Sequence, residues 1–207
     1  MLLAIDIGNT HTMLGIFRSK KLIADWRISS AMPRTEDELW ITVELFLEHA
    51  KVNADGLSGA VISSVVPNLT SIFAFMVAKY LHLDPLTISA ALDIGMPIKY
   101  DNPNAVGADR LCNAVAAYVK YSGPCIVIDF GTATTFDVVS PKGEYLGGAI
   151  APGIETASLD LQRQTAVLPK IDLQFPESVI GNTTVASMQS GILFGAVDAV
   201  EGLVKRI

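Results

Sequence analysis

Residues 4–17 read AIDIGNTHTMLGIF, and residues 127–140 read VIDFGTATTFDVVS. Each stretch is an apolar run, followed by a D-x-G turn with hydroxyl side chains and then by a second β-rich run. At an offset of 123 residues, Asp6 aligns with Asp129, Gly8 with Gly131 and Thr12 with Thr135. The similarity extends through two strands, a polar turn and a third strand, which predicts two similar halves facing each other across a cleft.

The two D-x-G turns have the chemistry of a phosphate-binding loop. Glycine permits a tight turn with outward-pointing backbone N–H groups, and the hydroxyl side chains add small donors. The aspartate of each turn, Asp6 or Asp129, is a candidate partner for a cation. Taken alone, each turn is equally consistent with an ordinary β-hairpin. Because two unrelated turns would seldom share their register over this length, the repetition favours phosphate binding.

Composition excludes several classes of protein. Half of the 207 residues are hydrophobic and only 17% are charged, which suits one large or two small domains with much buried surface or a large subunit interface. A net charge of −6 and the lack of a basic cluster argue against nucleic acid as a partner. No apolar stretch reaches the roughly 18 residues of a membrane span, and no signal peptide is apparent. Cys112 and Cys125 have neither disulfide nor zinc-site spacing, so we expect a cytoplasmic protein.

Local patterns predict the order of helices and strands. The T-E-D-E sequence at Thr35 is a capping box, and Pro67 can occupy the first turn of a helix. The apolar run 2–7 is expected to be a central strand buried on both faces. The expected strands are residues 2–7, 12–17, 22–28, 59–64, 86–88, 125–129, 134–140 and 145–151, and the expected helices are residues 35–50, 67–81, 107–119, 154–163 and 184–207.

Three further motifs admit both a chemical and a structural interpretation. In Gly107–Arg110, Asp109 is a candidate base or a carboxylate stabilised by the helix dipole, and Arg110 is a candidate anion ligand or a surface salt-bridge partner. The glycine-rich element Gly147–Gly153 either approaches a ligand closely or lets a strand pack under a helix. Gly181–Thr184 is expected to cap the last helix.

Two single residues are also open to both interpretations. Tyr100 lies in the loop before Asp109, where an aromatic ring can cover a ligand or make a core contact. His11 lies within the first D-x-G turn, and we interpret it as a solvated turn residue.

Taken together, these residues resemble the type III pantothenate kinases of the acetate-kinase, sugar-kinase, heat-shock and actin superfamily. The matching motifs are D-I-G-N-T at 6–10, G-A-D-R at 107–110, D-F-G-T-A-T-T at 129–135, G-G-A-I-A-P-G at 147–153 and G-N-T-T at 181–184. The first motif fits the whole superfamily, whereas the set in this order is specific to this kinase group.

The resemblance implies an α/β fold of duplicated ribonuclease H-like (actin-like ATPase) domains, residues 1–115 and 116–207. Each domain is expected to be a mixed five-stranded sheet flanked by helices, with a cleft between the domains. Family members run longer, and the predicted last helix has no stop signal, so the C-terminal domain is expected to lack its last helices.

The resemblance also implies an ATP-dependent kinase that makes 4′-phosphopantothenate, the first step of coenzyme A biosynthesis, and that forms a homodimer. Asp109 is implied as the general base, Asp6 as the ligand of magnesium through water, and Asp129 as the ligand of potassium or ammonium. The implied ATP-binding residues are Asp6, Ile7, Gly8, Asn9, Thr10, His11, Thr12, Met13 and Thr132, and the implied pantothenate-binding residues are Tyr100, Gly107, Ala108, Asp109, Arg110 and Thr184.

Neither D-x-G turn contains a lysine, so backbone N–H groups and cations would neutralise the charge that develops during phosphoryl transfer. Two alternatives stay open: another small-molecule kinase or phosphatase of the same superfamily, and a non-catalytic accessory or regulatory protein. The presence of Asp6, Asp109 and Asp129 argues against the non-catalytic alternative.

Overall fold

The computed structural model describes all 207 residues and divides them into two compact units, Met1–Lys120 and Tyr121–Ile207. Every predicted helix and strand is confirmed, with each boundary within two residues of its expected position. The expected domain boundary between residues 115 and 116 would cut α3 (Ala108–Tyr121), whereas the division of the structure falls at the end of that helix. The cleft between the two domains stays a prediction.

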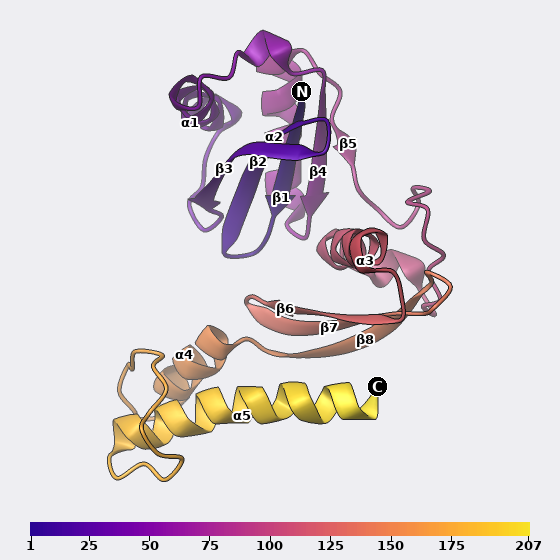
Figure 1. Cartoon of the computed structure of the whole chain (residues 1–207). Coiled ribbons are helices and arrows are strands. Elements are labelled where there is room, and N and C mark those ends of the chain that lie inside the picture. Colours follow the sequence, from indigo (N-terminus) through magenta and orange to yellow (C-terminus); the bar gives the residue numbers. More distant parts are fainter. The chain divides into compact units, whose positions relative to one another are not determined.

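The first unit is built on a mixed five-stranded sheet of order β3-β2-β1-β4-β5 (Figure 1). An antiparallel meander forms one side of the sheet, and two parallel strands continue it beyond β1. The strands are β1 (Leu2–Ile7), β2 (His11–Arg18), β3 (Lys21–Ser29), β4 (Gly59–Ser64) and β5 (Leu86–Thr87).

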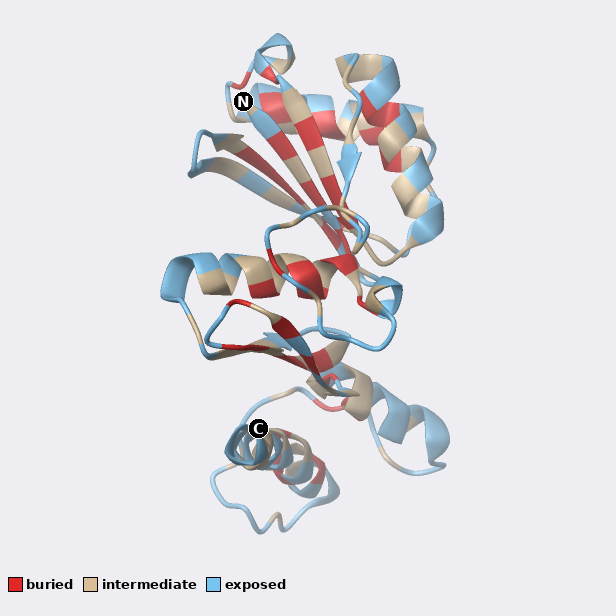
Figure 2. Ribbon diagram, turned by 90° about the vertical axis from the view of Figure 1, so that its right-hand side faces the viewer, coloured by how far each residue is buried: buried red, intermediate tan, exposed pale blue.

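Helices α1 (Glu36–His49) and α2 (Pro67–Leu81) bury the apolar side chains of this sheet. Buried residues line the central strands in Figure 2, as expected when helices cover a sheet. The capping box predicted at Thr35 is present, and Pro67 lies in the first turn of α2. Two short 3₁₀ turns, Ala54–Gly56 and Pro103–Ala105, complete the first unit with α3.

The central strand β1 is not buried on both faces along its whole length. Leu3, Ile5 and Ile7 are at most 1% exposed, whereas Leu2 is 41% exposed and Asp6 is exposed. The strand therefore alternates between a buried and a more open face, and the open face carries Asp6.

The second unit confirms the α/β class but not the expected five strands. Its sheet has three antiparallel strands, β6 (Cys125–Phe130), β7 (Ala133–Val139) and β8 (Tyr145–Pro152). Beyond them the chain forms α4 (Ile154–Gln164), an irregular segment at 165–183 with two prolines, and α5 (Thr184–Arg206). No segment after β8 supplies a further strand, because the remaining residues are helical or irregular.

None of the helices combines the length and the apolar content that crossing a bilayer would need. Cys112 and Cys125 are both free thiols.

Candidate active site

Asp6 lies at the carboxyl end of the central strand, where β1 and β4 run parallel. The register pairs Asp6 with Ser63, and the Ser63 Oγ donates a hydrogen bond to Asp6 Oδ1 at 2.8 Å. Ser63 is 7% exposed, whereas Asp6 is exposed. In open α/β sheets ligands bind beyond the carboxyl ends of the strands, so Asp6 occupies a position that suits a ligand.

The first D-x-G turn is braced by its own backbone and by Ser30. The Gly8 N–H donates to the His11 carbonyl at 3.0 Å, and the Ser30 N–H donates to the Thr10 carbonyl at 3.0 Å. The Thr12 hydroxyl, on a residue that is 1% exposed, bonds the Ser30 hydroxyl at 2.8 Å. The turn therefore has a defined shape before any ligand binds.

The predicted ATP-binding residues of this turn divide by exposure. Asn9, Thr10 and His11 are exposed, so their side chains are accessible to a ligand. Ile7 is 1% exposed and packs in the core, and Thr12 is also 1% exposed, so neither side chain faces solvent. Met13 is half-buried, and its sulfur accepts a hydrogen bond from Arg27 Nε at 3.2 Å.

The second D-x-G turn is one residue shorter than the first, which corrects the sequence alignment. Asp6 pairs with Met13 across the first hairpin, whereas Asp129 pairs with Thr135 across the second. The residue that corresponds to Thr12 is therefore Thr134, not Thr135. Thr134 is 6% exposed and buried like Thr12, which supports this register. A constant offset in sequence does not detect a deletion inside a turn.

Two residues of the glycine-rich element and α4 hold the second turn. The Gly153 N–H donates to the Thr132 carbonyl at 3.1 Å, and the Thr156 hydroxyl donates to the same oxygen at 2.7 Å. A Cβ on Gly153 would collide with the carbonyl oxygens of Gly131 and Thr132. Gly153 therefore approaches the backbone of the turn closely, and its N–H is bonded to the turn, which is neither of the two roles expected from the sequence. Asp129 and Thr132 are both exposed at this end of the second sheet.

The start of α3 positions Asp109. The Leu111 N–H donates to the Gly107 carbonyl at 3.2 Å, and the Arg110 N–H donates to Asp109 Oδ1 at 2.8 Å. A Cβ on Gly107 would collide with Asp109 Oδ1, so glycine makes room for a half-buried carboxylate that folds back over the helix end. The positive end of the helix dipole favours negative charge at this point.

Arg110 is 8% exposed, which removes the surface salt-bridge interpretation of this side chain. Ala108 is 6% exposed, so its side chain belongs to the core and leaves its backbone for any contact with a ligand. Tyr100 is 39% exposed in the loop before α3. Thr184 is exposed as the first residue of α5, which Thr183 caps by accepting the Ala186 N–H at 3.1 Å.

Cys112 lies one helical turn after Asp109 on α3. Burial raises the pKa of the Cys112 thiol, the neighbouring Ser63 hydroxyl lowers it, and the charges of Asp6 and Asp109 raise it. Cys112 is therefore a neighbour of Ser63 and lies within electrostatic reach of both candidate carboxylates, Asp6 and Asp109.

Sequence reasoning missed Ser63, Cys112 and Thr156. Ser63 follows Asp6 by 57 residues and meets it only through the parallel pairing of β1 with β4. A serine near the end of a buried strand carries no local signal of such a contact. The i, i+3 spacing of Asp109 and Cys112 on a helix could have placed these two residues on neighbouring positions of one face.

The Asp6 carboxylate can bind magnesium when water and phosphate oxygens supply most of the ligands. No group of three or more His, Cys, Asp or Glu side chains could hold a metal ion by itself. Magnesium in phosphate-transferring sites uses one or two carboxylates, with water and phosphate oxygens as the remaining ligands. An exposed carboxylate steadied on one oxygen by Ser63 fits this mode of binding.

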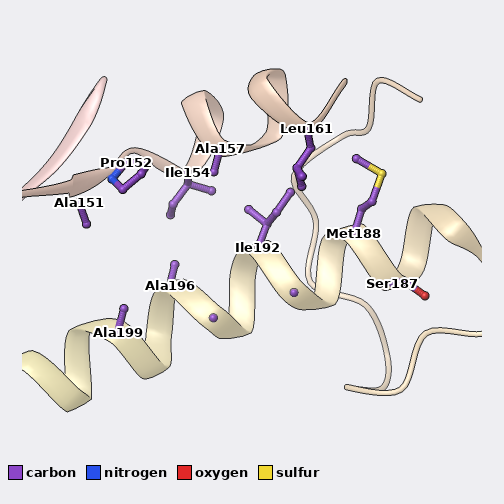
Figure 3. Close-up of a pocket in the computed structure, with 12 residues that line it drawn as sticks. Ala151, Pro152, Ile154, Ala157, Leu161, Ser187, Met188, Ile192, Ala196 and Ala199 are labelled. Atoms are coloured by element: carbon purple, nitrogen blue, oxygen red, sulfur yellow. The ribbon is translucent and has the colours of Figure 1, made fainter. Parts of the chain in front are cut away.

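A separate apolar groove of about 510 Å³ lies in the second unit between α4 and α5 (Figure 3). Ile154 and Leu161 approach it from α4, and Met188 and Ile192 from α5. None of the predicted ATP-binding or pantothenate-binding residues lines it.

The profile of the type III pantothenate kinase family matches residues 2–206. The type III pantothenate kinase of Moorella thermoacetica is 47% identical over 207 residues, which are 100% of this chain and 82% of that protein. A putative Baf family transcriptional activator from Campylobacter jejuni has a TM-score of 0.57 at 17% identity, covering 97% of this chain and 78% of that one. Component A of (R)-2-hydroxyglutaryl-CoA dehydratase from Acidaminococcus fermentans has a TM-score of 0.52 at 13% identity, covering 100% and 78%. At these identities the two solved structures bear on the fold alone.

Proposed function

This chain belongs to the type III pantothenate kinase family, and from that premise we propose which role each of its site residues has in the reaction. The family activity is ATP-dependent phosphorylation of pantothenate in coenzyme A biosynthesis, so ATP and pantothenate are the substrates. The proposals below concern the roles of individual residues, the cations, the oligomeric state and the compartment.

Asp109 is the general base that accepts the proton of the pantothenate hydroxyl. The observation that carries this assignment is the half-buried carboxylate at the start of α3, held by the Arg110 N–H at 2.8 Å and given space by Gly107. A positioned carboxylate of this kind contributes about a hundred- to ten-thousand-fold in rate. A different alcohol substrate would need the same general base, so the assignment of Asp109 does not depend on pantothenate being the substrate.

The first D-x-G turn and Asp6 serve the ATP phosphates. Exposed Asn9, Thr10 and His11 can donate hydrogen bonds from side chains, and Ile7, Gly8, Thr12 and Met13 contribute through the shape and backbone of the turn. Asp6 orients magnesium through water. When bound, magnesium neutralises charge on the phosphate oxygens.

Asp129 and Thr132 are the residues of the second unit that we assign to the monovalent cation and to ATP. Asp129 binds potassium or ammonium with its exposed carboxylate, and Thr132 contacts ATP. The Thr132 carbonyl is held by Gly153 and Thr156, so the orientation of this residue is restrained before ATP arrives. The monovalent cation supplies positive charge where the turns carry no lysine.

Pantothenate is bound by residues around the start of α3, together with Tyr100 and Thr184. Arg110 is suited to the carboxylate of pantothenate, because guanidinium groups bind carboxylates with two parallel hydrogen bonds. The pocket is completed by Gly107, Ala108 and Asp109.

The functional unit is a cytoplasmic homodimer that needs neither nucleic acid nor a membrane. The low charged fraction of 17% and exposed apolar side chains such as Val119 and Phe130 support burial against a second copy. Free cysteines support a reducing compartment.

The test is steady-state phosphorylation of pantothenate by the wild-type chain and by Asp109→Asn, with and without potassium. Asp109→Asn is expected to keep ATP binding and to lose most turnover, whereas Asp84→Asn, at an exposed loop carboxylate, serves as the matched control. Near-normal turnover in Asp109→Asn would remove Asp109 as the base. A panel of other small alcohols and phosphate esters separates the kinase from a phosphatase or another kinase, and binding without turnover of any substrate would support the accessory role.

A further inference from the structure

We propose that Ser63 is a positioning residue for the kinase reaction, because its hydroxyl holds the Asp6 carboxylate by a hydrogen bond. The proposal rests on the role proposed above for Asp6 in binding magnesium with ATP. It adds a residue on β4 that touches neither the substrate nor the reacting atoms.

Strand geometry places Ser63 directly beside Asp6. The two residues are paired in the parallel ladder between β1 and β4, so their side chains project from the same face of the sheet. The Ser63 Oγ lies 2.8 Å from Asp6 Oδ1, which is a good distance for a hydroxyl-to-carboxylate hydrogen bond. Ser63 is 7% exposed, so water has little access to compete for this contact.

The single proton of the Ser63 hydroxyl is committed to Asp6. A serine hydroxyl carries one proton, and Ser63 donates it to Asp6 Oδ1. A hydrogen bond to a charged carboxylate is stronger than one to a neutral acceptor, so this contact restrains the carboxylate. Cys112 on α3 is a second neighbour of the same hydroxyl: burial raises the pKa of its thiol, and the Ser63 hydroxyl lowers it.

Loss of the Ser63 hydroxyl would act directly on the Asp6 carboxylate. The hydroxyl makes a hydrogen bond to Asp6 Oδ1. Removing it would leave Asp6 free to turn about its side-chain bonds. The fold would keep its strand pairing, because the backbone ladder between β1 and β4 does not use this hydroxyl.

The experiment measures binding of a non-hydrolysable ATP analogue by calorimetry, with magnesium and with EDTA. Ser63→Ala is expected to weaken magnesium-dependent binding about tenfold, because residues that support a metal-binding carboxylate typically contribute 10- to 100-fold in metal affinity. Binding in EDTA is expected to change less than about twofold. Ser63→Thr, which keeps the hydroxyl, should restore most of the magnesium effect.

Ser64→Ala is the matched control on the same strand. The Ser64 hydroxyl accepts from Thr70 at 2.7 Å and from the Val66 N–H at 3.1 Å, so it supports the start of α2. Ser64→Ala is expected to lower thermal stability without changing the magnesium dependence.

Asp6→Asn separates this inference from the proposed function. If Asp6→Asn weakens magnesium-dependent binding and folded Ser63→Ala does not, the positioning role is overturned and the role of Asp6 stands. If Asp6→Asn has no effect on magnesium dependence, the assignment of Asp6 itself fails. Should Ser63→Ala unfold, the equally shaped pair Ser63→Thr and Ser63→Val takes its place, and equal magnesium dependence in the two variants overturns the proposal.

Discussion

Replacing Gly107 with alanine tests whether the position of the Asp109 carboxylate controls catalysis. The new Cβ would collide with Asp109 Oδ1 and lie 3.4 Å from Val65 Cγ1. Gly107 does not have a positive φ, so alanine adopts its backbone conformation without strain. The collision involves the end of one side chain, and the expected response is that the carboxylate rotates while the helix stays folded.

The magnitude follows from the hydrogen bond that the rotation would break. Asp109 Oδ1 accepts the Arg110 N–H at 2.8 Å, and hydrogen bonds to charged groups contribute about 1.5–3 kcal/mol. If that free energy is lost from the catalytic arrangement, kcat/KM falls by about 10- to 150-fold. A glycine-to-alanine change also restricts the unfolded chain, which stabilises the folded protein by about 0.4–1 kcal/mol. This gain partly offsets the lost hydrogen bond, so Tm should change little.

The assay combines steady-state kinetics with thermal unfolding, and Gly202→Ala is the control. A Cβ on Gly202, near the C-terminal end of α5, meets no atom within 4 Å, so that variant should keep its kcat and gain helix stability. In an Asp109→Asn background, Gly107→Ala should cause little further loss, because both changes act on one carboxylate. A folded Gly107→Ala variant with unchanged kcat/KM would refute the reasoning.

Three further outcomes are expected. Gly153→Ala should destabilise the second unit by about 1–3 kcal/mol, measured by urea unfolding, because its Cβ would collide with the Gly131 and Thr132 carbonyls rather than with a movable side chain; wild-type stability would contradict this. Thr35→Ala should lower stability by about 1 kcal/mol and leave turnover unchanged, because it removes the capping box of α1; a change in kcat would contradict a purely structural role. The pKa of Cys112 is raised in the folded protein, so its contribution to stability is present below the ordinary thiol pKa and is lost as pH rises through the higher folded value. When the free energy of unfolding is measured against pH, Cys112→Ser should lose less stability at alkaline pH than the wild type. An identical pH dependence in the two proteins would contradict this expectation.

The local elements were predictable because their signals lie within a few residues. The capping box at Thr35 and the proline at Pro67 mark helix starts without any tertiary contact. The repeated D-x-G turns predicted two meanders, and both are present. The length of the second turn was not predictable from the offset, because strand pairing, not residue identity, sets which threonine occupies the position of Thr12.

The sequence singled out candidate site residues one by one, but not how they are arranged. Asp6 and Asp109 stood out through their motifs, yet the contact of Ser63 with Asp6 depends on a parallel pairing between segments 57 residues apart. The role of Gly153 changed for the same reason, since only the folded second unit shows that its N–H is bonded to Thr132.

The sequence by itself determined the elements, the two aspartate-bearing turns and the family motifs, because helix capping, strand alternation and turn chemistry act over a few neighbouring residues. Tertiary structure alone decided which side chains support the functional carboxylates. The reason is physical: the Ser63–Asp6 and Cys112–Ser63 contacts form only when β1, β4 and α3 pack together, and that packing depends on contacts far apart in the chain.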